Sequence, residues 1–164
     1  MKKLLLALAA IALAGSLMAQ GAKLPENITL KSLDGQSVPS SVIKNDGKPV
    51  IISFWATWCK PCNRELNNIK EVYEEWQNET GVKLVAISID DARSAARVKP
   101  HVDGNDWPYE VYLDQNSDLK RAMNVVNVPH TFILNGKGEI VWQHTGYQDG
   151  GEEEVIEKVR ELVK

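Results

Sequence analysis

The pattern of apolar and polar positions along the chain predicts alternating strands and helices. Two nearly continuous apolar runs rich in β-branched residues, 49–55 and 82–89, are typical of strands covered on both faces. Between them the apolar residues follow a helical period over 60–79, and Gly81 ends that pattern. The helical stripe consists of Leu66, Ile69, Val72, Tyr73 and Trp76. The succession of strand, helix and strand predicts a βαβ unit with a right-handed crossover.

Weaker patterns extend this unit into a larger sheet. Residues 28–30 and 36–38 flank Asp34-Gly35, a strong turn signal, so we expect a β-hairpin there. The other expected elements are a helix at 94–102, a strand at 109–113, a helix at 117–123, hairpin strands at 131–134 and 139–144, and a helix at 152–163. In the last helix one face is formed by Val155, Ile156, Val159, Leu162 and Val163. The prediction is an α/β fold with a central mixed sheet flanked by helices.

The first 21 residues have a different character and are predicted to be a signal peptide. Lys2 and Lys3 precede an apolar run over 4–14, and small residues follow at Ala19 and Gly21. The run is shorter than the roughly 20 residues that span a bilayer, which favours a cleaved signal over a membrane anchor. We therefore expect a signal peptide at 1–21, a single domain at 22–164 and a periplasmic location.

Composition narrows the classes of function. The 164 residues, 43% of them hydrophobic, suit one globular domain with a core. A formal net charge of −3 without a basic run gives no electrostatic footprint for nucleic acid. The two cysteines are too few for a disulfide scaffold or a four-cysteine zinc site. Export would place them where disulfides persist.

The two cysteines carry the candidate chemistry. They end the segment 54–62, Phe-Trp-Ala-Thr-Trp-Cys-Lys-Pro-Cys, where a predicted strand gives way to a helix. A helix N-terminus and a CxxC partner lower a cysteine pKa from about 8.5 into a range of roughly 3.5 to 7.5. Lys60 adds a cation, and Pro61 suits the first helical turn. We expect Cys59 to attack disulfides and the more buried Cys62 to resolve the mixed disulfide.

Other roles for this pair compete with thiol–disulfide exchange. A purely structural disulfide is weak, because closing a two-residue loop contributes little chain entropy. A thiol peroxidase would use Cys59 alone, and a copper-binding protein would use Cys59, Cys62 and His130 as ligands. Exchange is favoured, because a CxxC beside a βαβ pattern in an otherwise cysteine-free domain is a fairly specific signal.

These motifs resemble the thioredoxin superfamily, in particular its exported TlpA/ResA-like thiol-disulfide oxidoreductases. The segment 54–62 is similar to their active-site motif, and 128–134, Val-Pro-His-Thr-Phe-Ile-Leu, followed by 136–141, resembles their second landmark. The resemblance runs from about 28 to 164. It implies a thioredoxin-like fold with a helix–strand insertion between Asp90 and Asn124. It also implies a reductant of protein disulfides, recharged by a membrane-bound electron donor. We expect no other cofactor, no metal and a monomeric protein.

The resemblance also implies a substrate groove. The Val128-Pro129 peptide bond is expected to be cis and to face the cysteines. The backbone of Val128 would pair with an extended substrate, and Trp58 would form another wall. Lys60 and Pro61, which separate the cysteines, are a main determinant of the reduction potential in this superfamily.

Two further side chains have open roles. Glu65 lies one helical turn after Cys62. In ResA-like members a glutamate at this spacing is associated with the active site and would handle the proton of the buried cysteine. It could equally be an ordinary first-turn glutamate facing the helix dipole. Ser53 stands where thioredoxin keeps a buried acid, so Glu65 is the candidate carboxylate. His130 would favour a thiolate if its imidazolium lay near Cys59, or it could simply occupy a strand face.

Overall fold

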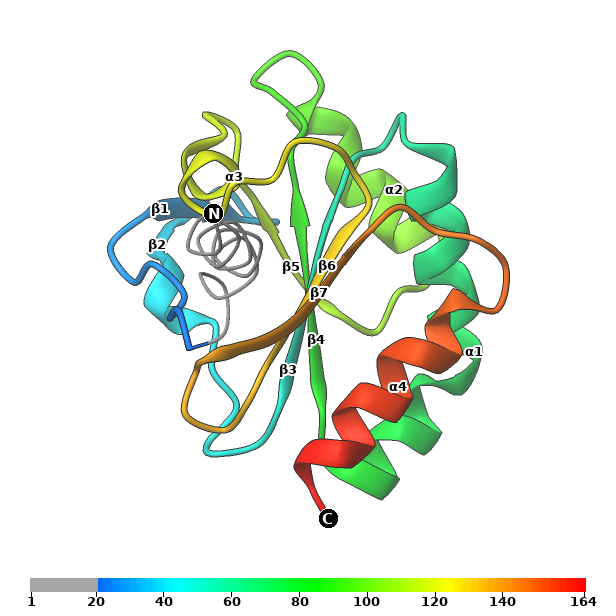
Figure 1. The fold of residues 1–164 in the computed structure, drawn as a ribbon. Helices are drawn as coiled ribbons and strands as arrows, with labels where there is room; N and C mark the ends of the chain where they lie inside the picture. Colours follow the sequence, from blue (N-terminus) through cyan, green and yellow to red (C-terminus); the bar gives the residue numbers. More distant parts are fainter. Residues whose placement is uncertain (1–20) are drawn as a thin grey trace, which may run out of the picture.

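A computed structural model describes residues 21–164, which form one seven-stranded sheet with helices on both faces (Figure 1). Of the predicted signal peptide only Gly21 falls within these residues, so that prediction lies outside the described part of the chain. The strand order is β2-β1-β5-β4-β3-β6-β7. The strands are β1 (Thr29–Ser32), β2 (Ser37–Pro39), β3 (Val50–Trp55), β4 (Lys83–Ser88), β5 (Glu110–Leu113), β6 (His130–Leu134) and β7 (Ile140–Thr145). The mixed α/β sheet predicted from the sequence is confirmed.

The centre of the sheet is parallel and its margins are antiparallel. β4 pairs in parallel with β3 and with β5, whereas β6 runs antiparallel to β3 and β7 antiparallel to β6. On the other side the β1–β2 hairpin attaches antiparallel to β5. Every residue of β3 is buried, as its nearly continuous apolar run predicts. The described residues begin beside β7, because Gly21 and Ala22 exchange backbone hydrogen bonds with Ile140.

One face of the sheet carries α1 (Lys60–Thr80), α4 (Gly151–Leu162) and α2 (Val98–Gly104). The predicted stripe on α1 is buried except for the half-buried Val72, and Gly81 ends the helix in a left-handed conformation with φ 69°. In α4, Val155, Ile156 and Val159 are buried as expected. Leu162 and Val163 are exposed, contrary to the sequence pattern, because the last turn of α4 reaches past the end of the sheet in Figure 1.

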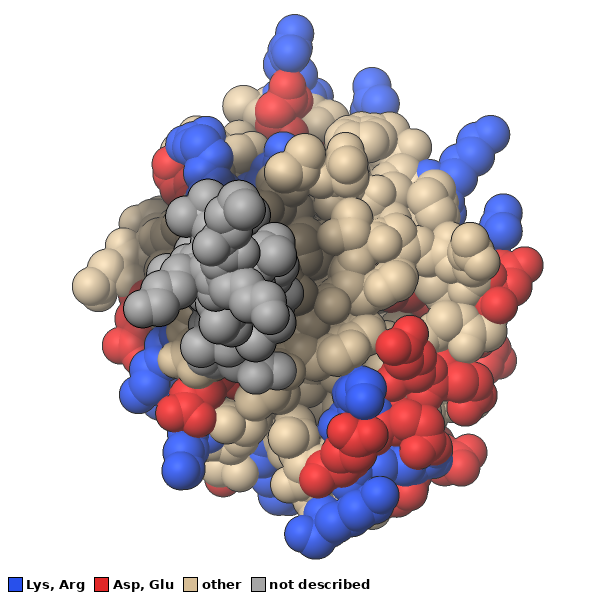
Figure 2. Space-filling view, in the orientation of Figure 1, with Lys and Arg blue, Asp and Glu red and all other residues tan. Residues whose placement is uncertain are grey.

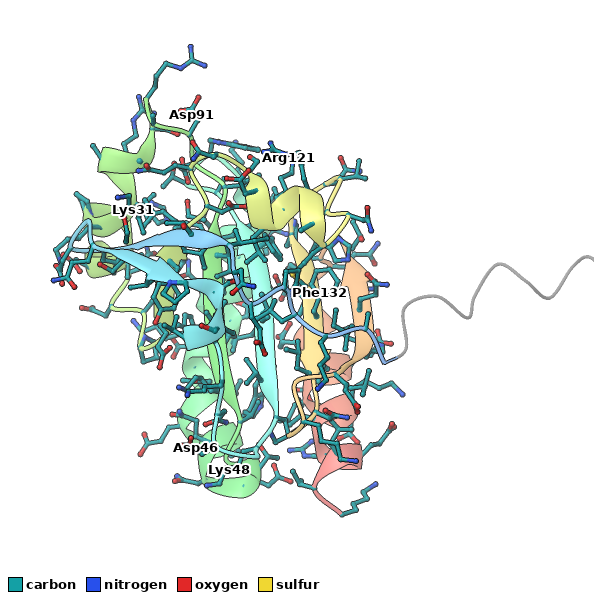
Figure 3. All side chains as sticks on the ribbon, turned by 90° about the vertical axis from the view of Figure 1, so that its left-hand side faces the viewer. Lys31, Asp46, Lys48, Asp91, Arg121 and Phe132 are labelled. Atoms are coloured by element: carbon teal, nitrogen blue, oxygen red, sulfur yellow. A yellow bond between two sulfur atoms is a disulfide. The ribbon has the colours of Figure 1, made fainter. Side chains whose placement is uncertain are left out.

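The other face is covered by α3 (Asp118–Ala122) and the β1–β2 hairpin. Their apolar side chains form a second core with the residues of β3 and β6 that point away from α1. This core includes Leu119 of α3, Phe54 of β3 and Phe132 of β6. Phe132, labelled in Figure 3, lies within this layer. A sheet covered on both faces explains why its central strands read as continuous apolar runs.

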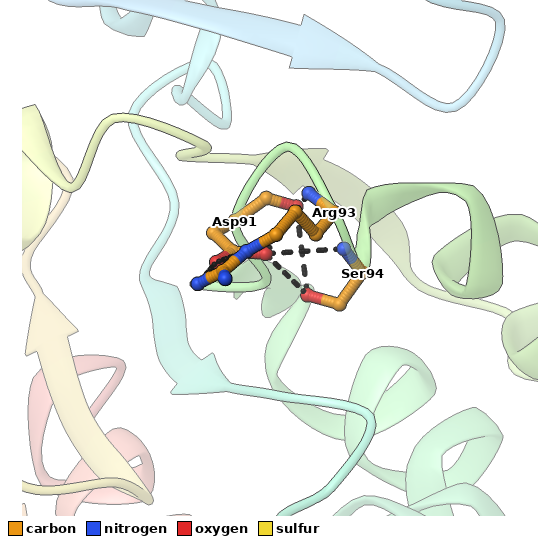
Figure 4. Close-up of polar contacts among 3 residues, drawn as sticks. All are labelled: Asp91, Arg93 and Ser94. Atoms are coloured by element: carbon orange, nitrogen blue, oxygen red, sulfur yellow. Dashed lines mark hydrogen bonds and ion pairs between the residues drawn. The ribbon is translucent and has the colours of Figure 1, made fainter.

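The segment between β4 and α3 contains the predicted helix and strand. The helix begins later than expected, since a 3-10 turn at Ala95–Arg97 leads into α2. Asp91 fixes the start of this turn: its carboxylate accepts hydrogen bonds from the backbone N–H groups of Arg93 (3.0 Å) and Ser94 (3.1 Å) and from both side chains (Figure 4). No helix within residues 21–164 is long and apolar enough to cross a membrane.

Candidate active site

The two cysteines lie where β3 meets α1 and form a disulfide, with 5.3 Å between their Cα atoms. Cys59 is the N-cap residue of α1, and the backbone N–H of Cys62 donates to its Sγ at 3.3 Å. Cys59 is 5% exposed and Cys62 is fully buried. Since a helix N-terminus favours negative charge, a thiolate formed at Cys59 on reduction meets a hydrogen-bond donor already in position.

The residues named from the sequence as a substrate groove come from two segments, the one that carries the cysteines and the start of β6. Trp58 is 63% exposed, and Lys60 and Pro61 are exposed as well. The Val128-Pro129 peptide bond is cis. His130 pairs with Phe54, which brings the proline to the end of β3, and Val128 packs against the core cluster that contains both cysteines.

Glu65 is a buried carboxylate, 3% exposed, rather than a surface residue of the first helical turn. Thr131 donates its hydroxyl to Oε1 at 3.0 Å, and Ser53 donates to Oε2 at 3.4 Å. Burial raises the pKa of Glu65 to about 7 and the charge of Glu152 adds to the rise, while the two hydroxyl groups act in the opposite direction. A carboxyl group with this pKa can accept or release a proton near neutral pH.

Of the two placements of His130 that the sequence leaves open, the structure shows the one on a strand face. Alternate residues of a strand point to opposite faces, and Thr131 points toward Glu65 on α1. The ring of His130 therefore lies on the other face, stacked on Phe132 with centroids 4.3 Å apart, and its Nε2 contacts Gln143 at 3.0 Å. Burial lowers the pKa of His130.

The three ligands of the alternative copper site, Cys59, Cys62 and His130, therefore do not form a metal-binding group in this structure. Among residues 21–164, no three His, Cys, Asp or Glu side chains lie close enough together to hold a metal ion. On the face seen in Figure 2, basic side chains stand singly or among acidic ones.

Sequence reasoning missed a set of polar side chains that hold the turn before Cys59. Asp90, fully buried just after β4, accepts hydrogen bonds from the backbone N–H of Thr57 at 2.8 Å and from its hydroxyl at 2.6 Å. Ser88 donates to the same carboxylate at 2.8 Å. From the other side the amide nitrogen of Asn63 donates to the Cys59 carbonyl at 2.8 Å. An acidic residue directly after a buried strand, at the edge that carries the cysteines, was the available signal for Asp90.

A thioredoxin-like sheet with a cysteine pair at the start of α1 defines a thiol-disulfide oxidoreductase. Comparison of the sequence with known proteins supports this class. The chain belongs to the AhpC/TSA family, whose model matches residues 21–143.

Curated relatives are named as members of the same enzyme class, and solved structures share the fold. The chain is 31% identical over 138 residues to the thiol-disulfide oxidoreductase ResA of Halalkalibacterium halodurans, covering 84% of this chain and 74% of the relative. It is 28% identical over 117 residues to the sporulation thiol-disulfide oxidoreductase A of Bacillus subtilis, covering 71% of this chain and 68% of the relative. A thioredoxin-like protein from Porphyromonas gingivalis has a TM-score of 0.76 and 57% identity, over 88% of this chain and 94% of that one. StoA from Bacillus subtilis has a TM-score of 0.64 and 25% identity, over 87% of this chain and 100% of that one.

Proposed function

We propose that this oxidoreductase reduces protein disulfides, with Cys59 as the attacking and Cys62 as the resolving cysteine. The Cys59 thiolate attacks one sulfur of the substrate disulfide, a mixed disulfide forms, and the other substrate sulfur leaves as a thiolate that takes up a proton. The Cys62 thiolate then attacks Cys59 Sγ, which releases the second substrate thiol. Two electrons pass from the cysteine pair to the substrate. The observation that carries this proposal is the placement of Cys59 at the N-cap, with the N–H of Cys62 directed at its sulfur.

Glu65 is proposed to accept the proton of Cys62 before the resolving attack. Cys62 is fully buried, so its thiol needs a nearby base inside the protein to become a thiolate. Glu65 follows one helical turn later on the same face and has a pKa raised to about 7. The hydroxyl groups of Ser53 and Thr131 hold the carboxylate in place.

The substrate is proposed to bind as an extended segment across Trp58 and the Val128-Pro129 loop. A backbone that adds a strand beside Val128 gains main-chain hydrogen bonds, and the exposed indole of Trp58 supplies apolar contact. Lys60 and Pro61 would line the outer rim of this groove, where both are exposed.

We further propose that the protein acts as a monomer in the periplasm and is recharged by a membrane-bound electron donor. The basic and apolar pattern of 1–21 supports export. A donor is required because each catalytic cycle leaves the cysteine pair oxidised.

The decisive experiment traps the mixed disulfide. In a Cys62→Ala variant we expect Cys59 to form stable adducts with protein thiols, identified by mass spectrometry after thiol blocking. A Cys59→Ala variant is the matched control and should trap none. A Cys62→Ala variant that traps no protein but consumes hydroperoxide would overturn the proposal in favour of a thiol peroxidase. The reduction potential decides the direction, since a value near −270 mV is typical of a reductant and one near −120 mV of an oxidant.

A further inference from the structure

Polar side chains spaced about one helical turn apart on α1 form hydrogen bonds with the segment 101–109. His101 Nε2 contacts Asn63 Oδ1. Trp107 Nε1 donates to Asn67 Oδ1 at 2.7 Å, and Lys70 Nζ donates to the carbonyl of Asn105 at 2.8 Å. These three contacts form a polar row along one side of the helix. Of the three α1 residues, Asn63 is the one that also bonds to the turn carrying Cys59.

The amide of Asn63 joins this turn to the helix. Its Nδ2 donates to the carbonyl of Cys59 at 2.8 Å and lies 3.4 Å from the carbonyl of Thr57. On the opposite side of the turn Asp90 accepts both hydrogen bonds of Thr57. The backbone from Thr57 to Cys59 is thus held from two directions, by the end of β4 and by the first turns of α1.

His101 fixes the orientation of that amide. Two carbonyl oxygens face the amide nitrogen, so the amide oxygen faces His101, and the imidazole must donate through Nε2–H. The ring is confined between Trp55 and Trp107, with centroids at 5.6 and 5.4 Å. Its packing thus keeps Nε2 directed at Asn63.

We propose that His101 is a positioning residue that acts through Asn63 to hold Cys59 at the N-cap of α1. A chain of hydrogen bonds runs from the His101 imidazole through the Asn63 amide to the Cys59 carbonyl, and linked hydrogen bonds polarise one another. The inserted helix α2 thereby contributes to the reactivity of a cysteine that it does not supply. This inference rests on the proposed role of Cys59 as the attacking cysteine.

The test measures the reactivity of Cys59 in the reduced protein. Alkylation by iodoacetamide is followed against pH, with the modified cysteine assigned by mass spectrometry. In His101→Ala and Asn63→Ala variants we expect alkylation of Cys59 at pH 7 to be about three- to tenfold slower, the effect of losing one hydrogen bond. The thiolate titration should shift to higher pH, because Cys59 is held less firmly beside the helix N–H groups.

Three further variants separate positioning from general loosening. His101→Gln retains a donor near the place of Nε2 and should restore most of the rate, which also keeps the test valid if alanine perturbs α2. The double variant His101→Ala/Asn63→Ala should be no slower than Asn63→Ala, because both residues act through one chain. Lys70→Ala breaks the contact to the carbonyl of Asn105 in the same polar row and should leave the rate unchanged.

Additive losses in the double variant, or an equal loss in Lys70→Ala, would overturn the inference. A His101→Ala variant that reacts like the wild type would overturn it as well. A wild-type protein in which Cys59 is not the faster-reacting cysteine would instead refute the proposed catalytic roles, so the two failures are distinguishable.

Discussion

The buried carboxyl group of Glu65 predicts a pH-dependent stability. Its pKa is about 7 in the folded protein against 4.5 for the unperturbed group, mainly because burial disfavours the charge. The folded state therefore binds this proton more tightly than the unfolded state does. The resulting stabilisation is fully present below pH 4.5 and is lost as the pH rises through about 7. At 1.36 kcal/mol per pKa unit, the rise corresponds to about 3 kcal/mol.

Replacement of Glu65 by glutamine isolates this contribution. Glutamine retains an acceptor for Thr131 but does not titrate. The free energy of unfolding of the variant, relative to that of the wild type, should therefore increase by about 3 kcal/mol between pH 4.5 and pH 8. The assay is urea unfolding of the oxidised proteins, in which neither cysteine titrates. His101 and His130, whose pKa values burial lowers, titrate in both proteins and cancel from the comparison. A difference between the two proteins that stays constant over this range would refute the reasoning.

Three other outcomes follow from the site. The same Glu65→Gln variant should accumulate the mixed disulfide during turnover, because Cys62 loses the base that accepts its proton. Acid quenching and mass spectrometry measure this accumulation, and an unchanged amount would contradict the role of Glu65 as that base. Trp58→Ala should raise KM for a protein disulfide several-fold while changing the free energy of unfolding by less than about 0.5 kcal/mol, as suits an exposed side chain. Asp90→Ala should lower the free energy of unfolding, measured by urea titration, by about 2–4 kcal/mol, because Thr57 and Ser88 lose their buried acceptor. A loss below about 1 kcal/mol would show that water replaces the carboxylate.

The fold could largely be predicted because its signals are local. The nearly continuous apolar runs of β3 and β4, the helical stripe of α1 and the Asp34-Gly35 turn each lie within one segment of sequence. Errors arose where local pattern and global shape diverge. Leu162 and Val163 continue the apolar face of α4, but the sheet beneath them has ended.

The site was predictable only in part, because its second layer is assembled across the sheet. The spacing of Cys59 and Cys62 is local and could be read directly. Whether Glu65 is buried depends on Thr131, which stands opposite Ser53 only in the register of β6 against β3. That same register sends His130 to the far face, which no single-segment pattern could show.

The pairing of β6 with β3 has a consequence for the order of events during folding. Phe54 and His130 are neighbours in the sheet but distant in sequence, and contacts of this kind form slowly because a long loop must first close. Until they form, Glu65 has no partner in Thr131. The partners of the buried carboxyl group beside the pair are therefore complete only when β6 has joined β3.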